Sequence, residues 1–443
     1  SLADEHCSPA QVESPRKRPP QRRNRSSPLD LQKSQHVTLA PILSYCTNVH
    51  PGESFAELLE LIRGPLARVR REFSPQAPLG AGLWLAADAA TTLAQDPAAA
   101  EEARAALSEA GLFAYTVNAF PIGGFHDREV KERVYRPTWL NPARRRYSEA
   151  ACRALAALLP EGERGSVSTV PISYKAFGEG ERLATAGAQL GELAANLERL
   201  EAETGRELSL ALEPEPLAQL ETTSETLAFL REHVFSGAGR AAFVAAGGPA
   251  RDAEERLRRR VGICIDTCHL SCRYEDLLVS LEDIDREGAR VVKVQLSSAL
   301  ELLRPAERPE ALARLVGFSE PRYLHQTLAE TPGGVVALAD LPEVLDSQSK
   351  LRGDLSAASR LRTHFHVPLC WEGDAELGTT RPDLERALQA LAERCDHLEV
   401  ETYTFDVLPE AERARFDHDP VRMIVAELEW VRDALAERGL HHR

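Results

Sequence analysis

The sequence has no long apolar run and no excess of positive charge. No apolar stretch among its 443 residues approaches the ~20 residues that span a bilayer, so we expect no membrane span. The 53 lysines and arginines are outnumbered by 68 aspartates and glutamates, which gives a formal net charge of −15. Because surfaces that bind nucleic acid need a basic footprint, we also expect no nucleic-acid partner.

Two cofactor motifs are absent as well. Cys264, Cys268 and Cys272 are four residues apart, which is not the CxxC spacing of a structural zinc site. We interpret most of the eight cysteines as reduced core residues of a cytoplasmic protein, where disulfides are rare. No GxGxxG turn follows the first apolar segment, which argues against a dinucleotide-binding fold. The first residues also lack the apolar stretch of a secretory signal peptide, so we expect none there.

The first 36 residues differ in composition from the rest. The stretch from Ser14 to Pro28 is rich in Pro, Arg and Ser and has no periodic apolar positions. Such a segment cannot bury enough apolar surface to offset the entropy lost on ordering. We therefore predict a disordered tail over residues 1–36 and one domain over residues 37–443. The tail is locally basic, so contact with an acidic partner is the alternative.

From Leu39 onward, short apolar runs alternate with long segments of helical period. Strands are predicted at 41–46, 80–86, 112–118, 168–173, 208–213, 261–266, 291–296 and 397–403. Helices are predicted to include 54–73, 88–110, 148–159, 181–204 and 383–394, with Gly111 and Gly205 at C-terminal caps. Eight strands in β-then-α order predict a closed (β/α)8 TIM barrel of the α/β class. An open doubly wound sheet is the alternative.

Two segments are additions to the eight strand–helix units of a minimal barrel. Residues 236–252 are rich in Ala and Gly, and we predict a loop within the fifth helical region. Residues 297–361 are predicted to form an insertion after the seventh strand, with a helix and a hairpin of 323–329 with 335–339. The apolar segment 363–369 is interpreted as an extension of the same strand–loop unit. Long loops after barrel strands shape the active-site face.

Acidic residues gather at the predicted strand ends, where barrel enzymes carry their chemistry. The fifth strand ends at Glu213, the sixth at Asp266, and the eighth carries Glu401. Each glutamate taken singly would be read as a surface salt bridge. Because a carboxylate inside a barrel is costly unless it is paired or bound to a metal, the three together predict a divalent cation such as Mg, Mn or Zn.

Glu213 and Glu401 are the predicted catalytic pair. Strand parity places Glu213 on the inward face, whereas Glu215 shares that parity but lies beyond Pro214 and is expected at the rim. Two carboxylates on opposite faces of a bound hydroxy-carbonyl compound could remove and return a proton through an enediolate. A metal ion would polarise the substrate oxygens.

Other polar residues are predicted to line or support the pocket. His269 follows Asp266 by three residues, and the alternative for this pair is a helix-capping Asp with a surface His. His364 and His366 share one face of a Thr-His-Phe-His segment, either at a metal or in a packed cluster. Residues 118–126 are predicted to form a mobile loop over the barrel mouth. The remaining candidates are Asn48, His50, Asn118 and His126.

Several motifs resemble a known superfamily. The run Val-Gly-Ile-Cys-Ile-Asp-Thr-Cys-His at 261–269, Leu-Glu at 212–213 and Glu-Thr at 401–402 are similar to strand ends of the xylose-isomerase-like superfamily, which includes sugar isomerases, epimerases and endonuclease IV. Longer stretches, such as Asn-Ala-Phe-Pro-Ile-Gly-Gly-Phe-His at 118–126 and Thr-His-Phe-His-Val-Pro at 363–368, resemble the EboE family of metabolite traffic proteins. The resemblance covers about residues 39–435 and excludes the tail.

This resemblance implies a TIM barrel that acts on a small-molecule metabolite in the handling of a secondary-metabolite precursor. It also implies metal ligands at Glu213, Asp266, position 295 and Glu401. Position 295 is Gln where the superfamily has His, and an amide oxygen suits a hard ion such as Mg or Mn better than Zn. Two functions stay open: a metal-dependent isomerase or epimerase, and a non-catalytic barrel that binds and hands over a metabolite. A trinuclear zinc nuclease is disfavoured, because the second and fourth predicted strands end without histidine.

Overall fold

The structure is a computed structural model, and it describes residues 40–127, 129–346 and 355–443. Leu39–Arg443 form one compact unit. The predicted tail, residues 1–36, lies outside the described residues. No helix in the described part of the chain is long and apolar enough to cross a membrane.

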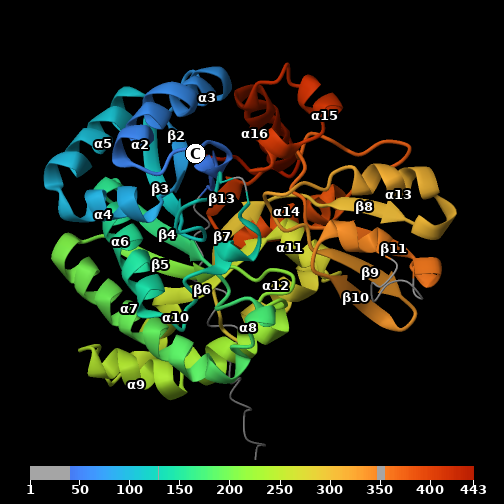
Figure 1. Ribbon diagram of the computed structural model, residues 1–443. Coiled ribbons are helices and arrows are strands. Elements are labelled where there is room, and N and C mark those ends of the chain that lie inside the picture. Colours follow the sequence, from blue (N-terminus) through green and yellow to red (C-terminus); the bar gives the residue numbers. More distant parts are fainter. Residues whose placement is uncertain (1–39, 128, 347–354) are drawn as a thin grey trace, which may run out of the picture. The chain divides into compact units, whose positions relative to one another are not determined.

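Eight parallel strands form the central sheet, in the order β1-β13-β7-β6-β5-β4-β3-β2. A parallel bridge between Cys46 and Gly82 joins the two ends of this order and closes the sheet. The chain is therefore a (β/α)8 TIM barrel of the α/β class, as the alternation predicts (Figure 1). The strands are β1 (Ile42–Tyr45), β2 (Leu79–Trp84), β3 (Leu112–Asn118), β4 (Arg164–Thr169), β5 (Glu207–Leu212), β6 (Val261–Asp266), β7 (Val291–Leu296) and β13 (His397–Val400).

Helices follow the barrel strands and surround them in Figure 1. After the first four strands come α2 (Phe55–Leu61), a π-helical turn (Ile62–Leu66), α3 (Ala67–Phe73), α4 (Ala87–Gln95), α5 (Pro97–Glu109), α6 (Pro142–Leu158) and α7 (Leu183–Thr204). After β5 and β6 come α8 (Thr223–Phe229), a second π-helical turn (Leu230–Val234), α9 (Gly237–Ala245), α10 (Ala253–Arg260), α11 (Thr267–Cys272) and α12 (Leu277–Arg286). The last three are α14 (Arg381–Arg394), α15 (Glu410–Ala414) and α16 (Pro420–Ala436).

The segment between β7 and α14 forms a second, antiparallel sheet of order β10-β9-β11-β8-β12 (Figure 1, orange). Its elements are β8 (Leu300–Leu303), α13 (Pro309–Val316), β9 (Thr327–Thr331), β10 (Gly334–Leu338), β11 (Arg360–Thr363) and β12 (Gly378–Thr379). The predicted hairpin is present as β9 and β10, although its first strand begins at Thr327. The segment 363–369 belongs to the same strand–loop unit, as predicted: Thr363 ends β11, which pairs with β8 and β9 inside this second sheet. The insertion thus extends past residue 361.

Three further predictions need correction. The fourth strand is Arg164–Thr169 rather than 168–173, because Pro171 has no N–H for the sheet ladder. The predicted helix 88–110 is two helices, since Asp96 caps α5 and Pro97 occupies its first turn. The predicted Ala/Gly loop at 236–252 contains α9 instead. Its Gly239 faces Gly191 of α7 so closely that a Cβ on Gly191 would lie 2.0 Å from the Gly239 carbonyl oxygen. These glycines allow two helices to touch.

Candidate functional site

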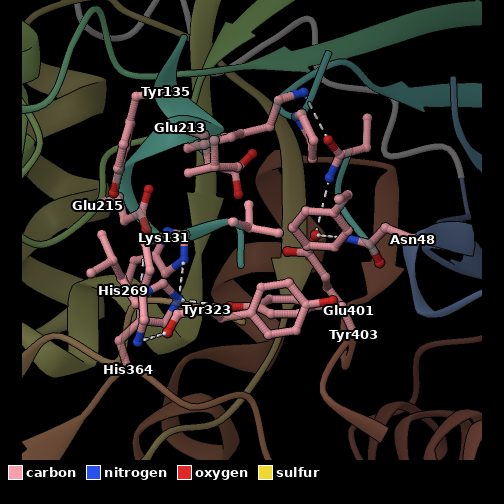
Figure 2. Close-up of a pocket in the computed structure, with 17 residues that line it drawn as sticks. Asn48, Lys131, Tyr135, Glu213, Glu215, His269, Tyr323, His364, Glu401 and Tyr403 are labelled. Carbon is pink, nitrogen blue, oxygen red and sulfur yellow. Dashed lines mark hydrogen bonds and ion pairs between the residues drawn. The ribbon is translucent and has the colours of Figure 1, made fainter. Parts of the chain in front are cut away.

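A cavity of about 60 Å³ lies at the C-terminal ends of the barrel strands. Segments far apart in the sequence line it together (Figure 2). The predicted site residues among the lining are Asn48, Asn118, Glu213, Glu215, His269, His364 and Glu401. Asp266, Gln295 and His366 are buried but do not line the cavity.

Three carboxylates converge at the floor of the site. Glu213, Asp266 and Glu401 each offer an oxygen within 4.8 Å of the others, and all three side chains are buried. Glu213 Oε2 and Asp266 Oδ2 have no hydrogen-bond partner among the described residues. Burial, together with the charge of Asp266, raises the pKa of Glu213 well above its ordinary value. Burial and the charge of Glu213 do the same to the pKa of Glu401. This arrangement is costly without a cation.

The two side-chain oxygens of Asp266 make different contacts. Its Oδ1 accepts the backbone N–H of His269 at 2.9 Å, which caps α11, and the Ser297 hydroxyl at 2.7 Å. Its unpaired Oδ2 lies 3.9 Å from Nε2 of both His269 and His366. Burial opposes ionisation of Asp266, but these imidazoles and hydrogen bonds hold its pKa below the ordinary value. Asp266 is therefore a helix cap as well as a member of the carboxylate group, and His269 is buried rather than on the surface.

Two amides fix the orientation of Glu401. The side-chain Nδ2 atoms of Asn48 and Asn118 both donate to Glu401 Oε1, at 2.8 Å and 3.0 Å. Asn48 follows β1 and Asn118 ends β3, so both predicted polar residues reach the site from the mouth of the barrel. Their bonds occupy one oxygen of Glu401 and leave the other for a ligand or a proton.

Three buried imidazoles meet beside the carboxylates. His269 Nε2 lies 3.1 Å from His364 Nε2, which lies 3.2 Å from His366 Nε2. Their Nδ1 atoms face the Pro214 carbonyl, the Gln326 side-chain oxygen and the Glu401 carbonyl respectively, at 2.7–3.0 Å. Because those oxygens only accept, each Nδ1 carries the proton and each Nε2 presents a lone pair.

These lone pairs make the imidazoles candidate metal ligands. Burial lowers all three pKa values, that of His269 to about 4, so the rings are neutral at pH 7. Asp266, His269 and His366 form a second group that could hold a cation, and it shares Asp266 with the carboxylate group. His364 and Cys268 could join a ligand set with His366. His364 and His366 follow β11 rather than lie on a strand.

Gln295, the residue at the position where the resemblance implies a histidine, is fully buried on β7. Its Oε1 accepts from the Cys264 thiol at 3.6 Å, and its Nε2 has no hydrogen-bond partner in the described part of the chain. The thiol therefore competes for the amide oxygen that would face a metal ion.

Besides His366, two predicted site histidines lie outside the cavity lining. His50 Nε2 is 3.1 Å from the Tyr45 hydroxyl, and His126 packs against Trp84 and Phe125 with ring centroids 5.6 Å and 5.5 Å apart. Phe125, rather than the expected His126, lines the cavity. Burial lowers both histidine pKa values to about 4.

Glu215 is a predicted site residue whose position differs from the prediction, and several other lining residues have no counterpart among the predicted ones. Glu215, expected at the rim, is buried, and burial raises its pKa to about 8. Lys131 and Tyr135 reach the cavity from a short 3-10 helix (Lys131–Tyr135) and Tyr323 from an irregular segment, so no long periodic pattern points to them. Tyr403 stands two residues after Glu401, and that spacing is a signal that could have identified it.

A buried ion pair lies in the barrel core. Lys293 on β7 contacts Glu399 on β13 at 2.6 Å, and both side chains are fully buried. Burial opposes the charge of Lys293, but Glu399 raises its pKa above the ordinary value. The positive charge of Lys293 also lowers the pKa of Glu213 and Glu401, and so offsets part of the repulsion between the carboxylates.

Comparison with known proteins finds likeness in structure alone. No protein-family model and no curated protein matches the chain. A xylose isomerase-like TIM barrel protein from Mycobacterium smegmatis in complex with magnesium is 10% identical, with a TM-score of 0.46, over 90% of this chain and 97% of that one. The 3-keto-D-glucoside 4-epimerase from E. coli is 16% identical, with a TM-score of 0.34, over 57% and 78%.

A third structure, the IOLI protein with a binding zinc atom, is 12% identical, with a TM-score of 0.31, over 58% of this chain and 73% of that one. At these identities the likeness concerns the fold and not the activity. The structures similar to this chain thus include a xylose isomerase-like TIM barrel protein. The (β/α)8 barrel of this chain rests on its own strand order.

Proposed function

We propose that this protein is a metal-dependent isomerase or epimerase of a small hydroxy-carbonyl metabolite. One observation carries the proposal: Glu213, Asp266 and Glu401 converge in a buried site, and two of their oxygens have no partner among the described residues. Buried charges are retained when they are paired or bind a metal. The cavity beside the carboxylates supplies the space for a small substrate.

The donor set fits a divalent cation. The unpaired Glu213 Oε2 and Asp266 Oδ2, with a Glu401 oxygen, would be its ligands. Nε2 of His366 or His269 would complete the set on the other side of Asp266, and Gln295 Oε1 is the alternative. Such a cation, when bound, polarises adjacent substrate oxygens and acidifies the C–H bond beside them.

The protein's own residues would move the proton. Glu213 comes from the end of β5 and Glu401 from the end of β13, and two strands separate these in the barrel, so the two carboxylates approach a substrate from different sides. Asn48 and Asn118 hold Glu401 through Oε1. One carboxylate would take a proton from the substrate carbon and keep it, and the other, protonated beforehand, would donate its own proton to the neighbouring carbon or the opposite face.

The resemblance to EboE proteins supports a more specific metabolic role and location. We infer that the metabolite is a precursor in secondary metabolism and that the protein works in the cytoplasm. The carrier function would use the same cavity without proton transfer.

Exchange of a substrate C–H proton with solvent deuterium tests catalysis. The protein would be loaded with Mg²⁺ or Mn²⁺ and mixed in D2O with a panel of ketoses and hydroxy-ketones, and the exchange would be followed by NMR. Glu213→Gln and Glu401→Gln keep an oxygen but remove the base, so the exchange rate should fall roughly 10²–10⁴-fold.

The matched control is Glu207→Gln. Glu207 begins the same strand at the opposite end of the barrel, and its substitution should leave the exchange rate unchanged. If the wild-type protein binds a metabolite tightly but exchanges no proton, the proposed enzyme function fails and the carrier function takes its place.

A further inference from the structure

We infer that the substrate of this site is an uncharged compound in which two adjacent oxygens are joined to an apolar, aromatic body, and not a free or phosphorylated sugar. The part of this inference that concerns the two adjacent oxygens rests on the proposed function. The remainder depends on the walls of the cavity.

One wall consists of three aromatic rings in mutual contact. Phe125, Tyr323 and Tyr403 all line the cavity, and their ring centroids are 5.0–5.3 Å apart. Figure 2 shows the rings of Tyr323 and Tyr403 together on the Glu401 side of the site. Tyr403 meets each of the other two rings edge to face, whereas Phe125 and Tyr323 are tilted at 39° to each other. The three rings present an apolar surface to a ligand.

A second apolar wall adjoins Glu215. Phe120 and Tyr135 line the cavity with their ring centroids 5.8 Å apart, and Val134 lies beside them in the lining. The carboxylates and imidazoles occupy the floor. A molecule that fills the cavity therefore meets polar groups at one end and apolar groups along its sides.

Among the described residues, no Lys or Arg side chain of the lining is free to hold a phosphate or a carboxylate. Lys131 is the only Lys or Arg among the described residues that line the cavity. Its Nζ already donates to the Glu320 carbonyl at 3.1 Å, the Tyr323 carbonyl at 2.7 Å and Asp340 at 2.5 Å. An ammonium group has three protons, so Lys131 has none left for a ligand. An anionic ligand would also lie beside the three buried acidic residues of the lining, Glu213, Glu215 and Glu401.

Few polar groups of the lining remain to recognise a polyol: outside the carboxylate group, the described lining atoms without a partner are Asn48 Oδ1, Glu215 Oε2 and the Tyr323 hydroxyl. Both lining asparagines donate to Glu401, and the Nδ1 atoms of His269 and His364 donate to oxygens of the protein. A buried hydroxyl without a partner costs binding energy, and a free sugar brings several. The cavity therefore favours a ligand with two chelating oxygens and few others.

Isothermal titration of the Mn²⁺-loaded protein tests this inference. The probes are 2-hydroxy-1-phenylethanone, D-fructose and D-fructose 1-phosphate. We expect the aryl hydroxy-ketone to bind at least tenfold more tightly than fructose, and the phosphate to bind more weakly than either. Tyr323→Leu should weaken the aryl probe about three- to tenfold, as expected for the loss of one ring contact, and leave Mn²⁺ affinity unchanged.

Phe177→Leu is the matched control. Phe177 packs on Tyr174 outside the cavity lining, so its substitution should not change the affinity for any probe. Tighter binding of fructose or its phosphate than of the aryl probe, to a protein that binds Mn²⁺, would overturn the inference and leave the proposed function standing.

Failure to bind Mn²⁺ would instead count against the proposed function. The aryl probe would then be titrated into the metal-free protein together with Tyr323→Leu. If the wild type binds the aryl probe more tightly than Tyr323→Leu in that titration, the apolar part of the inference is upheld. Equal binding by the two proteins, or no binding, would overturn it.

Discussion

Individual buried acidic residues determine much of the chemistry of this barrel. Glu427 is one such residue, and it lies outside the cavity lining. It stands on α16, and its Oε1 accepts from the Thr402 hydroxyl at 2.7 Å and the Leu369 backbone N–H at 2.9 Å. Burial raises its pKa from 4.5 to about 7. Glu427 thus ties the segment after Glu401 to the segment after His366.

The raised pKa of Glu427 predicts a pH-dependent stability. Between pH 4.5 and about 7 the unfolded chain loses this proton while the folded protein keeps it, so the contribution is complete at low pH and is lost as the pH rises through 7. Glu427→Gln keeps the accepting oxygen and cannot ionise. Relative to wild type, this variant should gain thermal stability between pH 5 and pH 8, by on the order of 3 kcal/mol at most.

Glu429→Gln serves as the comparison for this measurement. Glu429 is an exposed residue of the same helix, and its substitution should leave the pH profile of the melting temperature unchanged. An identical pH profile for Glu427→Gln and wild type would contradict the assignment.

Whether a site residue can be predicted from the sequence depends on the element of the fold that carries it. Glu213, Asp266 and Glu401 are predictable because each directly follows or ends a buried strand whose direction is known. Lys131 and Tyr323 are not, because a one-turn 3-10 helix and an irregular loop bring them to the cavity, and such short segments carry no periodic pattern. Phe125 lines the cavity in place of the predicted His126 for the same reason.

At the scale of the element, β2 shows how closure of the barrel constrains sequence. Gly82 bridges to Cys46 where the sheet closes. A Cβ at this position would lie 1.7 Å from the Glu399 carboxylate and 2.9 Å from the Tyr45 carbonyl oxygen. The buried Lys293–Glu399 pair therefore occupies space that only glycine leaves open.

Gly82→Ala should destabilise the protein by roughly 1–3 kcal/mol or more, because the Glu399 side chain has no free volume to move into. Gly64→Ala is the control: it lies in the first π-helical turn, and no heavy atom comes within 4 Å of its added Cβ. That substitution should be neutral or slightly stabilising. Equal melting temperatures for the two variants would contradict the close approach of Gly82 to Glu399.

The elements themselves differ in how well the sequence predicts them. Strands β3, β6 and β7 match their predicted bounds, because long apolar runs end there at polar residues. Strand β4 does not, because Val170 and Ile172 extend the apolar pattern beyond the residues that pair. Helix α9 is missed because its glycines serve contact with α7, a tertiary reason that local composition does not contain.

At the scale of the whole molecule, the second sheet was the hardest feature to predict. Its β11 pairs with both β8 and β9, strands that lie about 30 to 60 residues earlier in the chain. Local patterns predict the hairpin of β9 and β10 but not these distant pairs. The barrel was predictable because consecutive strands are neighbours in it.

Residues 37–443 are proposed to be one domain. Limited proteolysis should remove only about the first 35 residues, whose composition cannot support a core, and leave the remainder resistant. Mass spectrometry of the resistant fragment checks the boundary. A stable cut within the barrel that yields two independently folded halves would contradict a single domain.

The central claim of this account is that buried carboxylates at three strand ends hold a divalent metal ion. Metal content, measured by elemental analysis of protein purified without chelator, tests it most directly in Asp266→Asn and in the control Asp276→Asn. Asp276 caps α12 as Asp266 caps α11, but it is not a member of the carboxylate group. We predict that wild type and Asp276→Asn carry one equivalent of metal and that Asp266→Asn loses it. Equal metal content in all three proteins, or none in the wild type, would contradict the claim.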